Sequence, residues 1–84
     1  MELLHAFGIT LKHFRKEKSW SQEELADHSG LDRTYISLLE RGHRNPTLST
    51  LFSLANCLGY QPNQFIKEIE ILLESRQGSV PNEN

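Results

Sequence analysis

The segment RTYIS, at residues 33–37, carries side chains that can recognise nucleic-acid bases. It contributes Arg33, Thr34, Tyr35 and Ser37. Arginine pairs with both major-groove acceptors of guanine, threonine and serine bond several base edges, and a threonine methyl contacts the methyl of thymine. Tyrosine can bond a phosphate or pack against the bases. If the segment is helical with Ile36 turned inward, these four side chains lie at its outer surface, which favours DNA base contacts. The alternative is a structural helix with an ordinary solvated face.

The residues directly before this segment predict another helix. Ser21 and Glu24 are spaced as a capping box, in which each side chain accepts a hydrogen bond from the backbone N–H of the other residue. Gly30 can adopt the left-handed conformation that ends a helix without the steric cost of a Cβ. The sequence therefore predicts a helix over residues 22–29.

A second helix carries the RTYIS segment itself. Asp32 is a good N-cap, and Gly42 is placed to end the helix, so it is predicted over residues 33–41. Only residues 30–32 separate the two helices. A connection of this length containing glycine is typical of a helix-turn-helix, in which the second helix enters the major groove. The motif is predicted over residues 22–41.

The remaining apolar pattern supplies the scaffold. Apolar residues recur at helical spacing from Leu3, which predicts a first helix to about Lys18, with Gly8 as a point of close packing. Thr47 is placed to cap a helix that ends at Gly59, and a further helix begins near Pro62. The inward side of the helix after Thr47 is predicted to hold Leu48, Leu51, Leu54, Ala55 and Leu58. The fold is expected to be all-α, a compact domain of five helices over residues 1–76, followed by a disordered tail at 77–84.

The last predicted helix is more apolar than a free surface needs. Its stripe includes Phe65, Ile69, Leu72 and Leu73. An apolar extension of this kind suggests a protein partner. In a homodimer, the two recognition helices, one from each chain, would lie about 34–36 Å apart and could bind a near-palindromic DNA site. The alternative is that the helix folds back across the core of its own domain.

Residues 7–66 resemble the Xre family, the lambda repressor/Cro-type helix-turn-helix domain. The motifs are SQEELADHSGLDRTYISLLERGHRNPTL and LFSLANCLGYQPNQFI. Within that family, RTYIS followed by ERG and NPTL is most similar to the small controller proteins of restriction-modification systems. The resemblance implies a lambda-repressor-like fold and a transcriptional regulator, repressor or activator, that binds double-stranded DNA near its own and neighbouring promoters. An antitoxin or adaptor whose fifth helix binds another protein is the alternative.

The resemblance also assigns residues to the DNA. Base contacts are expected from Arg33, Thr34, Tyr35 and Ser37. Contacts with the DNA backbone are expected from Ser21, Gln22, Arg41, Arg44 and Asn45.

Net charge counts against nucleic-acid binding until its distribution is considered. The formal charge is −2 and the pI is near 6.0, which is not the basic value usual for such proteins. However, residues 62–84 account for the whole excess of acid, so residues 1–61 sum to zero. The basic side chains expected on the outer face of the first helix or beside the reading helix are Lys12, Arg15, Lys16, Lys18, Arg33, Arg41 and Arg44. A polarised field, with the acid away from DNA, is therefore expected.

Other chemistry has little support in the sequence. Cys57 is the only cysteine and reads as a small buried hydrophobe, which fits a reducing cytoplasm. The four histidines lack metal-ligand spacing, so we expect no catalytic residue, metal or cofactor. No apolar run approaches the roughly 18 residues of a membrane-spanning helix, and no membrane partner is expected.

A domain this small leaves little room for a metabolite pocket. Occupancy of DNA is therefore expected to follow protein concentration. An activator would need an exposed contact for RNA polymerase, a further candidate partner, and the candidate residues are Glu23, Asp27 and Glu40.

Overall fold

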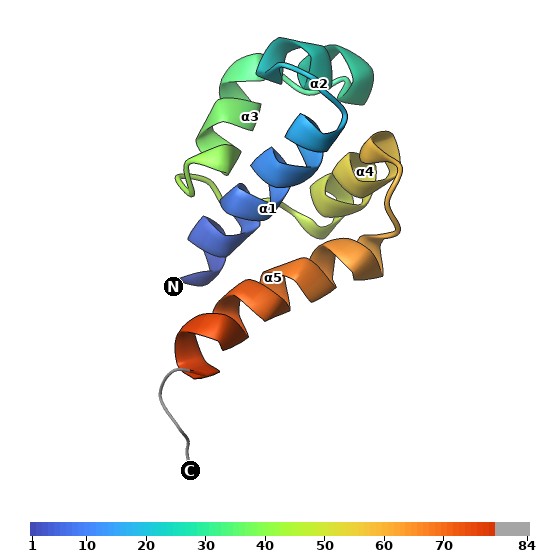
Figure 1. Cartoon of the computed structure of the whole chain (residues 1–84). Helices are drawn as coiled ribbons and strands as arrows, with labels where there is room; N and C mark the ends of the chain where they lie inside the picture. The colour runs from blue at the N-terminus through green and yellow to red at the C-terminus, as the bar shows by residue number, and fades with distance from the viewer. Residues whose placement is uncertain (79–84) are drawn as a thin grey trace.

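A computed structural model describes residues 1–78 of the chain, with side chains through residue 75. Over this range it contains five α-helices and no strand, as the sequence predicts (Figure 1). The helices are α1 Leu3–Glu17, α2 Gln22–Ser29, α3 Arg33–Glu40, α4 Leu48–Leu58 and α5 Pro62–Gly78. In Figure 1, α1 lies centrally, with α2 and α3 on one side and α5 along the opposite side. The surface that α3 presents is thus remote from α5.

The helix starts form through the caps that the sequence predicts. The N–H of Glu24 donates to Ser21 Oγ (3.0 Å), and the Glu24 carboxylate accepts from the N–H of Ser21 (2.8 Å). Asp32 accepts from the N–H of Thr34 (3.0 Å), and Thr47 accepts from the N–H of Thr50 (3.0 Å). These bonds satisfy backbone donors that have no partner inside a helix. The starts of α2, α3 and α4 are therefore fixed by residues next to them in the sequence.

The helix ends agree with the sequence to within two residues. Gly30 and Gly59 are left-handed C-caps, with φ of 75° and 83°. Arg41 follows α3 as its C-cap instead of being its last residue. The last helix, α5, includes residues 77 and 78, which are predicted from the sequence to belong to a disordered tail. The rest of that predicted tail, 79–84, lies outside the described residues.

Aromatic side chains of α1 and α5 form the centre of the core. The Phe65 ring lies 5.5 Å from Phe7 and 5.2 Å from Phe14, measured between ring centroids. Phe14 also stacks on Tyr60 at 4.0 Å. The largest fully buried side chains are Phe65, Leu11, Leu25, Ile36, Leu39, Leu54 and Leu58. All five helices thus share one core.

Two predictions about apolar residues need correction. Phe65 and Ile69, predicted as dimer contacts, are 0% and 5% exposed because α5 packs them into the core of its own domain, so Phe65 offers a second chain no surface and Ile69 offers very little. Leu48, expected in the core, is 71% exposed. A helical side chain leans toward the N-terminus of its helix, and Leu48 is the first residue of α4, so it extends beyond the core.

Gly8 lies where the backbone of α1 meets the end of α3. A Cβ added at Gly8 would stand 2.4 Å from the carbonyl oxygen of Glu40 and 2.7 Å from that of Leu39. Real Cβ atoms do not approach backbone oxygens this closely, so only glycine allows the contact. The close packing predicted for Gly8 is confirmed, and it sets the distance of α3 from α1.

Trp20 occupies the turn between α1 and α2. Its ring stacks on the imidazole of His28 with 4.0 Å between centroids and 8° between planes. The Lys18 ammonium lies 5.4 Å from the centre of the indole ring. This stack connects the entry into α2 with its last turn.

Candidate nucleic-acid interface

The outer side of α3 presents the four residues predicted to contact bases. Arg33 and Thr34 are exposed, while Tyr35 and Ser37 are partly buried. On the opposite side of this helix, Ile36 and Leu39 are fully buried, which fixes the rotation of α3 about its axis. The helix therefore holds a short polar surface outward, beginning at its N-terminal turn, where a reading helix contacts base edges.

Arg44 folds back from the loop after α3 onto that same surface. Its guanidinium carbon lies 5.2 Å from the centre of the Tyr35 ring. An arginine stacked on an aromatic ring still presents its N–H donors at its edge. The structure thus brings one predicted backbone contact beside one predicted base contact. Arg41 and Asn45, the other loop candidates, are exposed.

The N-terminus of α2 holds the remaining candidates, Ser21 and Gln22. Ser21 is exposed, and its hydroxyl oxygen accepts the capping bond from Glu24. Gln22 is partly buried, and its amide nitrogen donates to Glu40 Oε1 at 2.9 Å. A helix N-terminus favours anions through its backbone N–H groups and dipole. Both residues lie at the N-terminal end of α2, and their contact with DNA stays a prediction.

A buried ion pair joins the three helices around this surface. Arg15 Nε donates to Glu40 Oε2 at 2.6 Å, and Arg15 Nη2 donates to Glu40 Oε1 at 2.9 Å. The two side chains are 8% and 3% exposed. Arg15 Nη1 also donates to the carbonyl oxygen of Trp20 at 2.8 Å. One guanidinium thus ties α1 to the end of α3 and to the chain that enters α2.

This pair corrects two sequence interpretations. Arg15, predicted on the outer face of α1, is buried, and its charge is matched by that of Glu40. Glu40 was a candidate contact for RNA polymerase, and its burial removes it from that role. Helical spacing could have predicted this burial. Arg15 follows Leu11 by four residues and Glu40 follows Ile36 by four, so each charged residue lies on the inward face of its helix.

The six other basic residues predicted to contribute to the polarised field are exposed, and the field itself stays a prediction. Lys12, Lys16 and Lys18 are exposed on α1 and just after it, and Arg33, Arg41 and Arg44 are exposed on and beyond α3.

Cys57 is partly buried, and desolvation raises the pKa of its thiol although Lys18 opposes the shift. A raised pKa keeps the thiol protonated and makes it a poor nucleophile.

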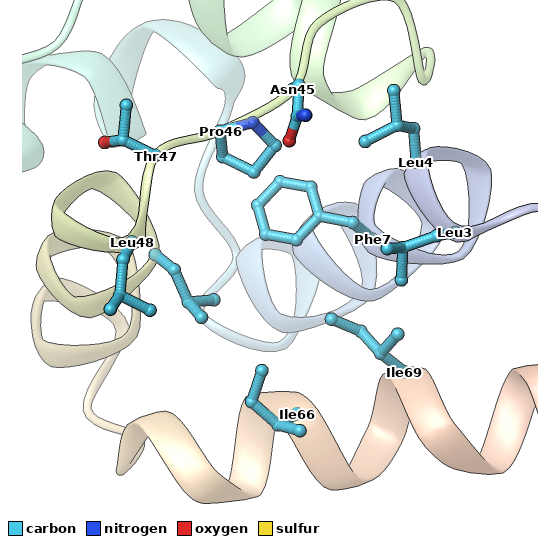
Figure 2. Close-up of a pocket in the computed structure, with 10 residues that line it drawn as sticks. Leu3, Leu4, Phe7, Asn45, Pro46, Thr47, Leu48, Ile66 and Ile69 are labelled. Carbon is cyan, nitrogen blue, oxygen red and sulfur yellow. The ribbon is translucent and has the colours of Figure 1, made fainter.

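An apolar groove lies away from α3, between α1, α4, α5 and the loop before α4. It encloses about 200 Å³. In Figure 2 the Phe7 ring lies between Pro46 and the two isoleucines, Ile66 and Ile69, that α5 contributes. The groove is lined by Leu3, Leu4, Phe7, Asn45, Pro46, Thr47, Leu48, Leu51, Ile66 and Ile69.

Among the described helices, none is long and apolar enough to cross a membrane.

Two capped helices, a three-residue turn and an outward polar surface on the second helix define a helix-turn-helix domain. The family model described as helix-turn-helix matches residues 11–65. The chain belongs to this helix-turn-helix family.

Controller proteins of restriction-modification systems are among its relatives. The control protein C.SmaI of Serratia marcescens is 45% identical over 58 residues, which cover 69% of this chain and 69% of that protein. The controller protein C.AhdI from Aeromonas hydrophila has a crystal structure similar to this one, with 44% identity, a TM-score of 0.71, and coverage of 74% of this chain and 94% of that one.

A third relative is known in complex with DNA. The controller protein C.Esp1396I, crystallised as a tetramer with its natural 35 base-pair operator, is 40% identical with a TM-score of 0.71. The match covers 82% of this chain and 96% of that chain. These likenesses agree with the family and the fold predicted from the sequence.

Proposed function

We propose that this protein is a sequence-specific transcriptional regulator of the restriction-modification controller type, which binds double-stranded DNA in the cytoplasm through α3. The observation that carries the proposal is the polar surface of α3, where Arg33, Thr34 and Ser37 point outward from a helix fixed by its cap and its buried side. The complex of C.Esp1396I with its operator supports it, because that relative shares this fold.

The working species is a homodimer formed through the apolar groove. Large apolar side chains are exposed at the groove or beside it, Leu3 at 58%, Phe52 at 48% and Ile66 at 41%. Exposed apolar surface of this kind favours association. The dimer contacts are thus assigned to these residues and Leu48, with Leu72 and Leu73 at the partly buried continuation of α5.

RNA polymerase is a partner only if the protein activates transcription. With Glu40 buried, Glu23 and Asp27 are the remaining candidates of the three, because both are exposed on α2. They lie four residues apart and therefore share one face of that helix.

Selection of bound duplexes from a random-sequence library tests the proposal. The experiment is run at about 150 mM salt, where general electrostatic binding to phosphates is weakened. Enrichment of a two-fold symmetric sequence is the expected result. Binding without enrichment would contradict sequence-specific regulation and favour a protein adaptor.

Arg33→Ala is expected to lower affinity for the selected site by about 1–3 kcal/mol and to relax the preference at one base pair. Arg44→Ala, the matched variant, is expected to weaken selected and random duplexes alike, because a phosphate contact carries no sequence information. Both are measured by titration of fluorescent duplexes. Equal losses on both duplexes for Arg33→Ala would remove Arg33 from base recognition.

Ile66→Glu is expected to raise the dissociation constant of the dimer by about 100-fold, because a two-fold interface would bury two unpaired carboxylates. Ile71→Glu is the control, since Ile71 is similarly exposed, at 44%, but does not line the groove. Sedimentation equilibrium measures both masses. A monomeric unmodified protein at tens of micromolar, or equal effects of the two substitutions, would argue against dimerisation through the groove.

A further inference from the structure

The Gln22 side chain is held by a residue far from it in the sequence. Its amide nitrogen donates to Glu40 Oε1 across 18 positions of the chain. Gln22 is the first residue of α2, and Glu40 is the last residue of α3. The bond therefore joins the outer N-terminal end of one motif helix to the buried C-terminal end of the other.

The buried ion pair dictates which end of the amide faces Glu40. An ionised carboxylate accepts hydrogen bonds and cannot donate them. Arg15 holds both oxygens of Glu40 through its Nε and Nη2 atoms. If the Gln22 amide flipped, its carbonyl oxygen would face a carboxylate oxygen, and the two would repel. Only the orientation with nitrogen toward Glu40 is stable.

The same guanidinium fixes the backbone from which Gln22 extends. Arg15 Nη1 donates to the carbonyl oxygen of Trp20, two residues before Gln22. The capping bonds of Ser21 and Glu24 then fix the first turn of α2. The backbone at Gln22 and the amide at the end of its side chain are thus both held in the DNA-free protein.

We propose that Glu40 is a positioning residue for DNA binding, which fixes the Gln22 amide so that its second N–H is directed to a DNA phosphate at the start of α2. An amide nitrogen carries two protons, and Glu40 uses one of them. This proposal rests on the proposed function, since it concerns the phosphate contact expected of Gln22. A side chain already held in its binding orientation loses less conformational entropy when it binds.

The consequence is a measurable dependence of one residue on the other. Gln22→Ala is expected to lower DNA affinity about tenfold, the usual size of one hydrogen bond to a charged group, on selected and random duplexes alike. In a Glu40→Gln background, the amide at position 40 no longer dictates the orientation of Gln22. There, Gln22→Ala is expected to lower affinity less than about threefold, because part of the contact is already lost.

A double-mutant cycle in DNA affinity tests this dependence. The four proteins are the unmodified chain, Gln22→Ala, Glu40→Gln and the double variant, titrated with the same duplex. A smaller effect of Gln22→Ala in the Glu40→Gln background supports the proposal, and an equal or larger effect overturns it. Failure of the unmodified protein to bind DNA would instead refute the proposed function, so the two failures are distinguishable.

A second measurement needs no substitution and holds even if Glu40→Gln does not fold. Hydrogen exchange of side-chain amides is followed by NMR in the unmodified, DNA-free protein. One Gln22 proton is expected to exchange at least about tenfold more slowly than the amide protons of Asn56 and Asn63, which are exposed. Exchange as fast as in those controls would show that Glu40 does not hold the amide and would overturn the proposal.

Discussion

Replacing Glu40 with leucine is expected to lower the free energy of unfolding by about 3–5 kcal/mol, the usual cost of removing one partner of a buried ion pair. The substitution leaves the Arg15 guanidinium buried without a counter-charge, and it leaves the Gln22 amide without its acceptor. Because small domains are stable by only about 5–15 kcal/mol, this loss is a large fraction of the free energy of unfolding. Urea unfolding followed by circular dichroism measures the loss.

The double variant Arg15→Met/Glu40→Leu separates lost charge from lost packing. Removing both charges replaces the ion pair by apolar side chains of similar length, which is often nearly neutral. We expect most of the stability to return, short of the parts due to the Trp20 carbonyl, which loses its donor, and the Gln22 amide, which still lacks its acceptor. A Glu40→Leu loss below about 1 kcal/mol would contradict the burial of Arg15, since it would mean that the guanidinium reaches water.

Gly8→Ala is expected to lower the free energy of unfolding by about 3 kcal/mol, at the upper end of the range for overpacking. Helix propensity alone predicts the opposite, a gain of about 1 kcal/mol. The close contacts decide the sign, because the new Cβ would meet two backbone carbonyls that cannot rotate away. Urea unfolding measures stability, and titration with a selected duplex measures whether α3 has moved.

Gly30→Ala is the control for Gly8→Ala. No heavy atom lies within 4 Å of a Cβ added at Gly30, but its φ of 75° is left-handed. Its cost should therefore be only the conformational strain of about 1–2 kcal/mol. Unchanged or increased stability of Gly8→Ala would show that α1 and α3 are not as tightly packed as described.

Local features of the fold could be predicted from the sequence because their causes are local. Ser21 and Glu24 are three residues apart, and Gly30 has its own conformational preference, so cap and turn follow from neighbouring residues. The outward position of Arg33 follows in the same way, since Ile36 shows which side of the helix faces inward. The helix bounds and the outward surface of α3 could therefore be predicted from the sequence.

Features that depend on distant partners were not predicted. Arg15 and Glu40 are 25 positions apart, and without the packing of α1 on α3 each reads as an ordinary surface charge. The stripe on α5 shows which side is apolar but not which residues its own core already covers. Phe65 was therefore assigned to a partner, whereas the groove beside it was missed. The stacking of Arg44 on Tyr35 likewise depends on the path of a loop.

Trp20 is the only tryptophan of the chain, and it stands at the entry into α2, stacked on His28. Indole fluorescence from this protein therefore has a single origin, two residues before Gln22. Any rearrangement of the α2 N-terminus against α1 must alter the stacked pair, and with it the colour and intensity of the emission. The chain thus contains its own unlabelled optical reporter, placed where events at the motif can be followed in real time.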